Sequence, residues 1–161
     1  CEFDLEFKEL LEKYKEKSIS IFNIEREQAK PRKDYSCCSD IKNQIWYMYD
    51  ELFDKNEKNY EFQKITDKEE IKKILTTYIN EYYVDSDSDA WFNKMKEMAE
   101  KLGYASNMKE YKQNPDNYKG NIADISNVLR VALTTKSMTP DLYQIMKILG
   151  SDTIKKRFEL I

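Results

Sequence analysis

The chain has 161 residues and a net charge of −3, and 35% of its residues are charged and 13% aromatic. This aromatic content is typical of a folded globular protein, and no run reaches the roughly 20 apolar residues that a membrane-spanning helix needs. Three Gly and three Pro are too few for a sandwich or barrel with frequent tight turns, and the absence of His removes the usual general base and the commonest zinc ligand. We therefore expect an all-α protein of one domain or two small ones.

The N-terminal third contains an apolar pattern of helical spacing. It predicts an amphipathic helix through Phe3, Phe7, Leu10, Leu11 and Tyr14. The apolar stretch 19–24 is ambiguous between helix and strand. Pro31 then excludes a continuing helix, and Arg32 and Lys33 place two cations on an exposed connection, where they are candidate residues for binding a polyanion.

Two more helices are expected before residue 84. Ser39-Asp40 predicts the N-cap of one long helix, whose apolar residues are Ile41, Ile45, Met48, Leu52 and Phe53. Thr66 or Asp67 predicts the cap of the next helix, which continues to Tyr82. Residues 1–84 are thus predicted to form a front helical bundle.

An acidic run at residues 85–90 is the predicted linker between two bundles. Its D-x-D-x-D pattern resembles a calcium loop, but Ala90 stands where that loop needs Gly and Lys96 where it needs Glu. The charge balance also changes here. Residues 1–90 carry 15 Lys or Arg against 22 Asp or Glu, a net charge of −7, whereas residues 91–161 carry 12 against 8, a net charge of +4. A polyanion would therefore meet mainly the back half.

Residues 91–161 are predicted to form the second bundle. We expect helices from Trp91 to the stop at Gly103, near residues 108–111, and over residues 121–134. Thr139 and Pro140 predict an N-cap and first helical position for a helix that Gly150 ends.

One polar flank of the back half could bind an anion. On a helical wheel Asn127, Arg130 and Thr134 lie opposite the apolar face, and Lys136 and a helix N-terminus at Thr139-Pro140 follow. Backbone N–H groups beside Arg and Lys suit a phosphate or a base edge. The alternative is an ordinary solvated face beside an ordinary cap. No Gly-rich phosphate loop and no carboxylate in an apolar surrounding is present, so we expect no catalytic residue.

Several motifs resemble, in order, the C-terminal anticodon-binding region of bacterial glutamate–tRNA ligases. They are Ile24-Glu25-Arg26-Glu27, Lys30-Pro31-Arg32-Lys33-Asp34, Ser39-Asp40, Trp91-Phe92, Ala99-Glu100-Lys101-Leu102-Gly103-Tyr104, Met108-Lys109-Glu110-Tyr111-Lys112, Asn114-Pro115, Tyr118-Lys119-Gly120, Arg130-Val131-Ala132-Leu133-Thr134, Thr139-Pro140-Asp141-Leu142-Tyr143-Gln144-Ile145-Met146 and Leu149-Gly150. The resemblance implies an all-α helix cage that grips the anticodon stem and loop of tRNA, with residues 1–84 as the stem-contacting segment.

The resemblance also implies the site residues. Arg130, Thr139, Pro140 and Leu142 match family positions at the anticodon surface, and we add Lys119 and Lys136 because of their charge. The chain departs from the family at Thr135, where Gly is usual, and at Cys37-Cys38, where Lys-Trp is usual.

The parent enzyme would attach glutamate to tRNA with ATP and magnesium. Its His-Ile-Gly-His and Lys-Met-Ser-Lys-Ser motifs are not in this sequence, so the fragment should need no cofactor and be inactive alone. The opening at Cys1 and the odd cysteine count suggest a segment of a reduced, cytoplasmic protein, which we expect to be monomeric. Two alternatives stay open: the corresponding domain of a class I lysine–tRNA ligase, and a helical protein-interaction scaffold without an RNA role.

Overall fold

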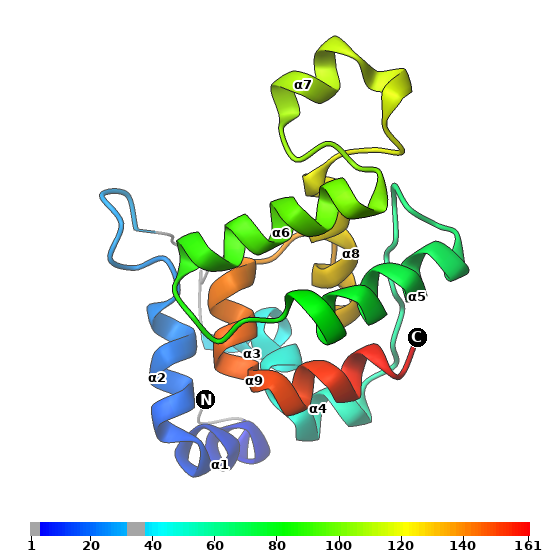
Figure 1. Ribbon diagram of the computed structural model, residues 1–161. Coiled ribbons are helices and arrows are strands. Elements are labelled where there is room, and N and C mark those ends of the chain that lie inside the picture. Colours follow the sequence, from blue (N-terminus) through cyan, green and yellow to red (C-terminus); the bar gives the residue numbers. More distant parts are fainter. Residues whose placement is uncertain (1–3, 32–37) are drawn as a thin grey trace. The chain divides into compact units, whose positions relative to one another are not determined.

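The computed structural model describes residues 4–31 and 38–161, and the regular elements in these ranges are helical (Figure 1). The predicted all-α class is confirmed. The elements are α1 (Leu5–Lys13), α2 (Lys15–Asn23), α3 (Cys38–Ile45), η1 (Trp46–Met48), α4 (Asp50–Lys55), α5 (Lys68–Thr77), η2 (Tyr78–Tyr82), α6 (Ser88–Leu102), α7 (Met108–Gln113), η3 (Pro115–Asn117), α8 (Ile122–Thr134) and α9 (Leu142–Phe158).

The chain forms two compact units. Unit 1 contains the described residues up to Lys58 together with Pro140–Ser151, and unit 2 contains Asn59–Thr139 and Asp152–Ile161. The predicted linker at 85–90 lies inside unit 2, so this grouping differs from a division at that run. Unit 1 also takes a segment from the C-terminal part of the sequence, which a division into consecutive stretches does not anticipate.

In unit 1 the predicted long helix from residue 39 to 53 is wrong. The chain forms α3, the short 3-10 helix η1 and α4, and Tyr49 between the last two is extended, with φ −113° and ψ 123°. Tyr47, Met48 and Tyr49 are all buried. The extended backbone at Tyr49 interrupts the i to i−4 hydrogen bonds of an α-helix, so the apolar residues from 41 to 53 do not belong to one helix. Ser39 and Asp40 lie within α3, which begins at Cys38, and are not its cap.

A polar contact lies inside the core of unit 1. The segment 19–24 falls mainly in helix α2, and the Ser18 hydroxyl lies 2.9 Å from Tyr49 Oη. The Tyr49 ring meets Phe7 of α1 edge-on, at 6.3 Å between ring centroids. Burial raises the pKa of Tyr49, although the hydrogen bond with Ser18 opposes this. Both side chains are therefore fixed as a neutral hydrogen-bonded pair.

Aspartate side chains cap the N-termini of two helices in unit 2. Asp67 accepts from the backbone N–H groups of Glu69 and Glu70, which selects Asp67 over Thr66 as the cap of α5. Asp87 accepts from Ala90 N at 2.8 Å and caps α6. The α5 helix continues into η2, which is a π-helix.

A buried hydrogen bond links the two sides of the acidic run. Trp91 Nε1 of α6 donates to Tyr78 Oη of η2 at 3.0 Å. Burial raises the pKa of Tyr78 to about 12. The phenol is therefore neutral and can accept from the indole at ordinary pH, which ties η2 to the start of α6.

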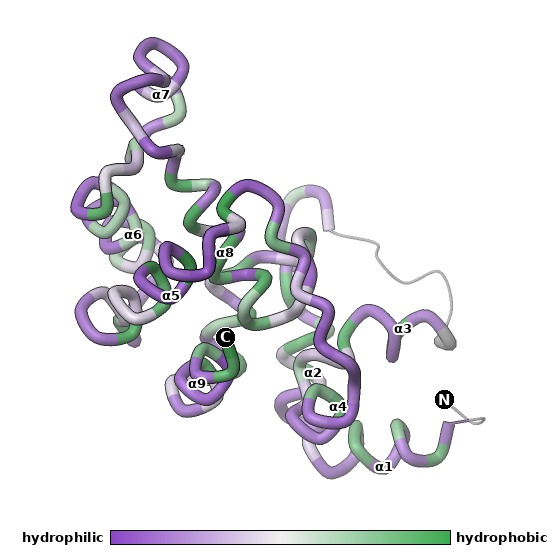
Figure 2. The backbone as a smooth tube through the Cα atoms, turned by 90° about the vertical axis from the view of Figure 1, so that its right-hand side faces the viewer, coloured by the Kyte–Doolittle hydropathy of each residue, from purple (hydrophilic) through white to green (hydrophobic). Residues whose placement is uncertain are grey.

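The segment from α7 to η3 extends away from the rest of unit 2 in both views (Figures 1 and 2). Neither element has a buried residue, and α7 is mostly hydrophilic (Figure 2). The two ends of this segment are joined by backbone hydrogen bonds, from Lys119 N to Gly103 O at 3.0 Å and from Ile122 N to Ala105 O at 2.8 Å. Gly103 ends α6 with φ 83°, as predicted.

Helix α8 has its predicted apolar face in the core, and Asn121 caps it in a capping box with Asp124. The cap predicted at Thr139 is wrong. Asp141 Oδ1 accepts from Gln144 N at 2.9 Å, and α9 begins at Leu142. Gly150, with φ 78° and ψ 164°, breaks α9 where the sequence predicted a stop.

Candidate nucleic-acid interface

The loop after α8 contains two of the predicted site residues, Lys136 and Thr139, and follows two more, Arg130 and Thr134, which lie in the helix. Thr135 ends the helix in the left-handed conformation, with φ 65° and ψ −8°, and its N–H donates to Val131 O at 2.7 Å. The chain can therefore turn sharply at Thr135, the position where the resemblance leads us to expect Gly. Met138 in this loop is 86% exposed, the largest value among the exposed large apolar residues of the described chain.

Arg130 holds the end of this loop. Its Nη1 donates to the carbonyl of Thr139 at 3.0 Å and to Thr139 Oγ1 at 2.6 Å. A charged donor gives stronger hydrogen bonds than a neutral one. The guanidinium is half-buried, so it fixes Thr139 and also borders the surface. The sequence placed these two residues at one site, and the structure brings them together.

Thr134 stabilises the start of the loop through hydrogen bonds of its hydroxyl. It is fully buried, and its hydroxyl lies 2.8 Å from the Arg130 carbonyl and accepts from Lys136 N at 3.2 Å. Thr134 therefore stabilises the backbone that carries Lys136 and presents no group of its own to solvent.

Lys136 is half-buried within this loop. Burial lowers the pKa of Lys136, and the charge of Glu61 opposes this. A partly desolvated ammonium attracts a nearby anion more strongly than one on an open surface, because the local dielectric constant is lower.

Three residues of this site, Glu61, Gln63 and Ser137, were not indicated by the sequence. Ser137 Oγ donates to Glu61 Oε2 at 3.2 Å and accepts from Gln63 Nε2 at 3.3 Å, and Asn127 Nδ2 donates to the Ser137 carbonyl at 3.3 Å. Glu61 and Gln63 lie between α4 and α5, outside any regular element, where no periodicity marks them. Together these bonds and those of Arg130 define the tethered loop, residues 135–139.

Lys119 belongs to a different group of residues. Its Nζ lies 2.9 Å from Glu70 Oε1, and Tyr104 Oη donates to the same oxygen at 3.1 Å. Burial raises the pKa of Glu70, but the hydrogen bonds from Lys119 and Tyr104 outweigh this and lower it overall. The Lys119 ammonium is half-exposed and so can still approach an anion from solvent.

The remaining predicted residues lie elsewhere. Pro140 and Leu142 belong to unit 1, and Leu142, at 4% exposure, packs in its core. Arg32 and Lys33 lie outside the described residues. In the described part of the chain, no cluster of three acidic or cysteine side chains suits a metal ion, and no helix combines the length and apolar character of a membrane span.

Comparison with known proteins gives a consistent set of similarities. A family model described as an anticodon binding domain matches residues 6–161. The chain is 41% identical over 159 residues to a glutamate–tRNA ligase of Clostridium perfringens and 39% identical over 158 residues to one of Acetivibrio thermocellus, in each case over 98% of this chain. It spans 29% and 28% of the length of these two relatives. No solved structure is significantly similar to the chain.

Proposed function

Because the chain belongs to the anticodon-binding-domain family, we propose that it is the tRNA-binding C-terminal region of a glutamate–tRNA ligase. In this role it recognises the anticodon stem and loop, while a catalytic domain elsewhere in the parent chain attaches glutamate with ATP and magnesium. The names of the relatives favour glutamate over the lysine alternative. We further propose that the parent is a cytoplasmic monomer and that this region alone is inactive.

The tethered loop is the observation that supports this proposal most directly. Proteins recognise single-stranded RNA loops through hydrogen bonds to the base edges and through stacking of the bases on flat side chains, both from groups held in fixed positions. Here one guanidinium fixes Thr139, while Glu61, Gln63 and Asn127 fix Ser137. A surface that is ordered before binding loses less conformational entropy when RNA arrives.

The experiment is a titration of the chain with glutamate tRNA at several salt concentrations. Each contacted phosphate should contribute about 0.7 to 0.9 to the log–log slope, so binding should weaken steeply with salt. Lys119→Glu and Lys136→Glu should weaken binding more than Lys8→Glu and Lys15→Glu, which make the same charge change in unit 1. Equal effects of all four variants would contradict the proposed surface.

Arg130 is tested by comparing preference with stability. Arg130→Ala should reduce discrimination between glutamate tRNA and an anticodon-swapped tRNA by about 1–3 kcal/mol if the guanidinium reads a base. Thr139→Val, at another predicted anticodon position, removes the hydroxyl that accepts from Arg130 and leaves the guanidinium in place, so it separates the loss of this contact from the loss of the charge. A large loss of stability in Arg130→Ala with an unchanged preference would make Arg130 a structural residue only.

A further inference from the structure

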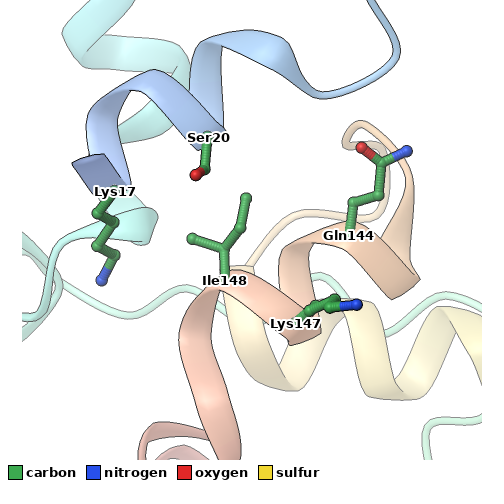
Figure 3. Close-up of a pocket in the computed structure, with 5 residues that line it drawn as sticks. All are labelled: Lys17, Ser20, Gln144, Lys147 and Ile148. Carbon is green, nitrogen blue, oxygen red and sulfur yellow. The ribbon is translucent and has the colours of Figure 1, made fainter. Parts of the chain in front are cut away.

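Unit 1 has a pocket of about 430 Å³ between α2 and the first half of α9 (Figure 3). The residues that line it are Lys17, Ser20, Gln144, Lys147 and Ile148. In Figure 3 the Ile148 side chain stands in the middle, and the two lysines lie on opposite sides of it. None of these five residues is assigned a role by the resemblance or by the proposed function.

The size and lining of the pocket suit a small flat ligand. Its volume lies in the range of about 300–1,000 Å³ that is usual for small-ligand sites. The branched side chain of Ile148 offers an apolar surface on which a ring can lie. The pocket is also open to solvent, so a group attached to a longer chain can enter it.

The charge of the pocket favours an anion. Two of its five lining residues are lysines, and none of the described residues lining it is Asp or Glu. Aromatic rings beside the pocket hold both ammonium groups. Lys17 Nζ lies 5.7 Å from the centroid of the Tyr49 ring, and Lys147 Nζ lies 5.8 Å from that of Tyr143. Such cation–π contacts restrict the long side chains without cancelling their charge.

The polar groups can pair with the edge of a base. Ser20 Oγ donates to the Glu16 carbonyl at 3.1 Å, which leaves its oxygen as an acceptor. The Gln144 side chain carries both a donor and an acceptor on one amide. A nucleobase edge needs this combination, whereas a free phosphate would use only the donors.

We propose that this pocket holds one unstacked nucleotide of single-stranded RNA, with its base on Ile148 and its phosphates beside Lys17 and Lys147. This inference rests on the proposed function, since it adds a nucleotide subsite to a tRNA-binding surface. A second lysine-bearing wall supplied by α2 would make both parts of unit 1 contribute to RNA binding.

The test is binding of an RNA hairpin with the anticodon arm sequence of glutamate tRNA. Ile148→Trp should fill the pocket and Ile148→Ala should remove its apolar floor, and each should weaken binding about tenfold, which corresponds to a loss of about 1.4 kcal/mol of contact with the base. Lys147→Glu should also lower the salt slope by about 0.7. Lys15→Glu is the matched control, because Lys15 is an exposed residue of α2 that does not line the pocket. Circular dichroism of each variant checks that the helices remain.

Competition separates the possible ligands. Cytidine monophosphate should displace the hairpin at lower concentration than inorganic phosphate, and a 2-aminopurine in the hairpin loop should change fluorescence on binding to the wild type but not to Ile148→Trp. Equal competition by phosphate, or stronger competition by an acidic peptide, would overturn the nucleotide assignment. If the wild type binds tRNA and both Ile148 variants bind equally well, only this inference fails. If the wild type binds no tRNA, the proposed function fails as well.

Discussion

The Thr135→Gly variant should be more stable than the Thr135→Ala variant, which is the reverse of the usual order within a helix. A residue with a Cβ atom in the left-handed conformation costs roughly 1–2 kcal/mol, and Thr135 has φ 65°. Thr135→Gly removes this cost and also the buried side chain, whereas Thr135→Ala removes the side chain and keeps the cost. The difference between the two variants therefore isolates the backbone conformation.

The magnitude follows from two opposing contributions. Glycine recovers roughly 1–2 kcal/mol in the folded state. It loses about 0.5–1 kcal/mol because the unfolded chain gains conformational freedom. The free energy of unfolding of Thr135→Gly should therefore exceed that of Thr135→Ala by about 0.5–1 kcal/mol. In a chain of this size, a difference of about 1 kcal/mol shifts Tm by about 2–4 °C.

Thermal unfolding followed by circular dichroism measures this difference. The matched control is the pair Asn93→Gly and Asn93→Ala, at an exposed position within α6. There alanine should be more stable by about 0.8–1 kcal/mol, because no left-handed residue is present. The reasoning would be refuted if alanine were also more stable at position 135.

Three further variants test individual polar contacts within each unit. Trp91→Phe removes the buried N–H that donates to Tyr78 and should cost about 1–3 kcal/mol in urea unfolding; a loss within error would show that the bond contributes nothing. Hydrogen bonding from Lys13 lowers the pKa of Glu51 to about 2, below its unfolded value of about 4.3, so its contribution to stability is present above that value and lost as pH falls towards 2. Glu51→Gln should therefore unfold with a weaker acid dependence than the wild type, and identical pH curves would contradict the pairing. Arg157→Met should cost about 1–3 kcal/mol by chemical unfolding, because the guanidinium is 1% exposed and donates to a carbonyl near the end of α8; an unchanged midpoint would exclude this role.

The local features of the fold were predictable from the sequence. Asp67 caps α5 and Gly103 ends α6, where the sequence placed each signal. A cap depends on a side chain and the backbone of the next few residues, so its information lies in a short segment. Helix existence and these boundaries therefore needed no knowledge of tertiary contacts.

Tertiary contacts decided the features that the sequence argument missed. Thr139 and Asp141 are both good cap residues, but Arg130 engages the Thr139 hydroxyl and leaves the cap to Asp141. The break lies at Tyr49, whose buried side chain meets Phe7 and pairs with Ser18, contacts that a helical wheel does not represent. Both depend on partners that are remote in sequence or on a core that forms only in the folded chain.

The candidate site also contains residues that the sequence indicated and residues that only the structure showed. The helical wheel placed Arg130 on the polar flank of α8 from its own neighbours, whereas Glu61 reaches Ser137 across 76 positions of sequence. The extended segment that contains Glu61 has no periodic pattern that could indicate its partner. The resemblance brought Arg130 and Thr139 into one site, but the contacts that hold the loop between them required the structure.

The net charge of the chain is a poor guide to where RNA would bind. Counterion release depends on the phosphates that individual Lys and Arg residues contact, so a chain with a net charge of −3 can bind a polyanion through a few local cations. Lys17 shows this most clearly, because it lies in the acidic front half of the sequence and lines a pocket whose described lining residues include no carboxylate. If the pocket binds a nucleotide, Lys17→Glu should weaken RNA binding more than Lys15→Glu, although both make the same change to the net charge.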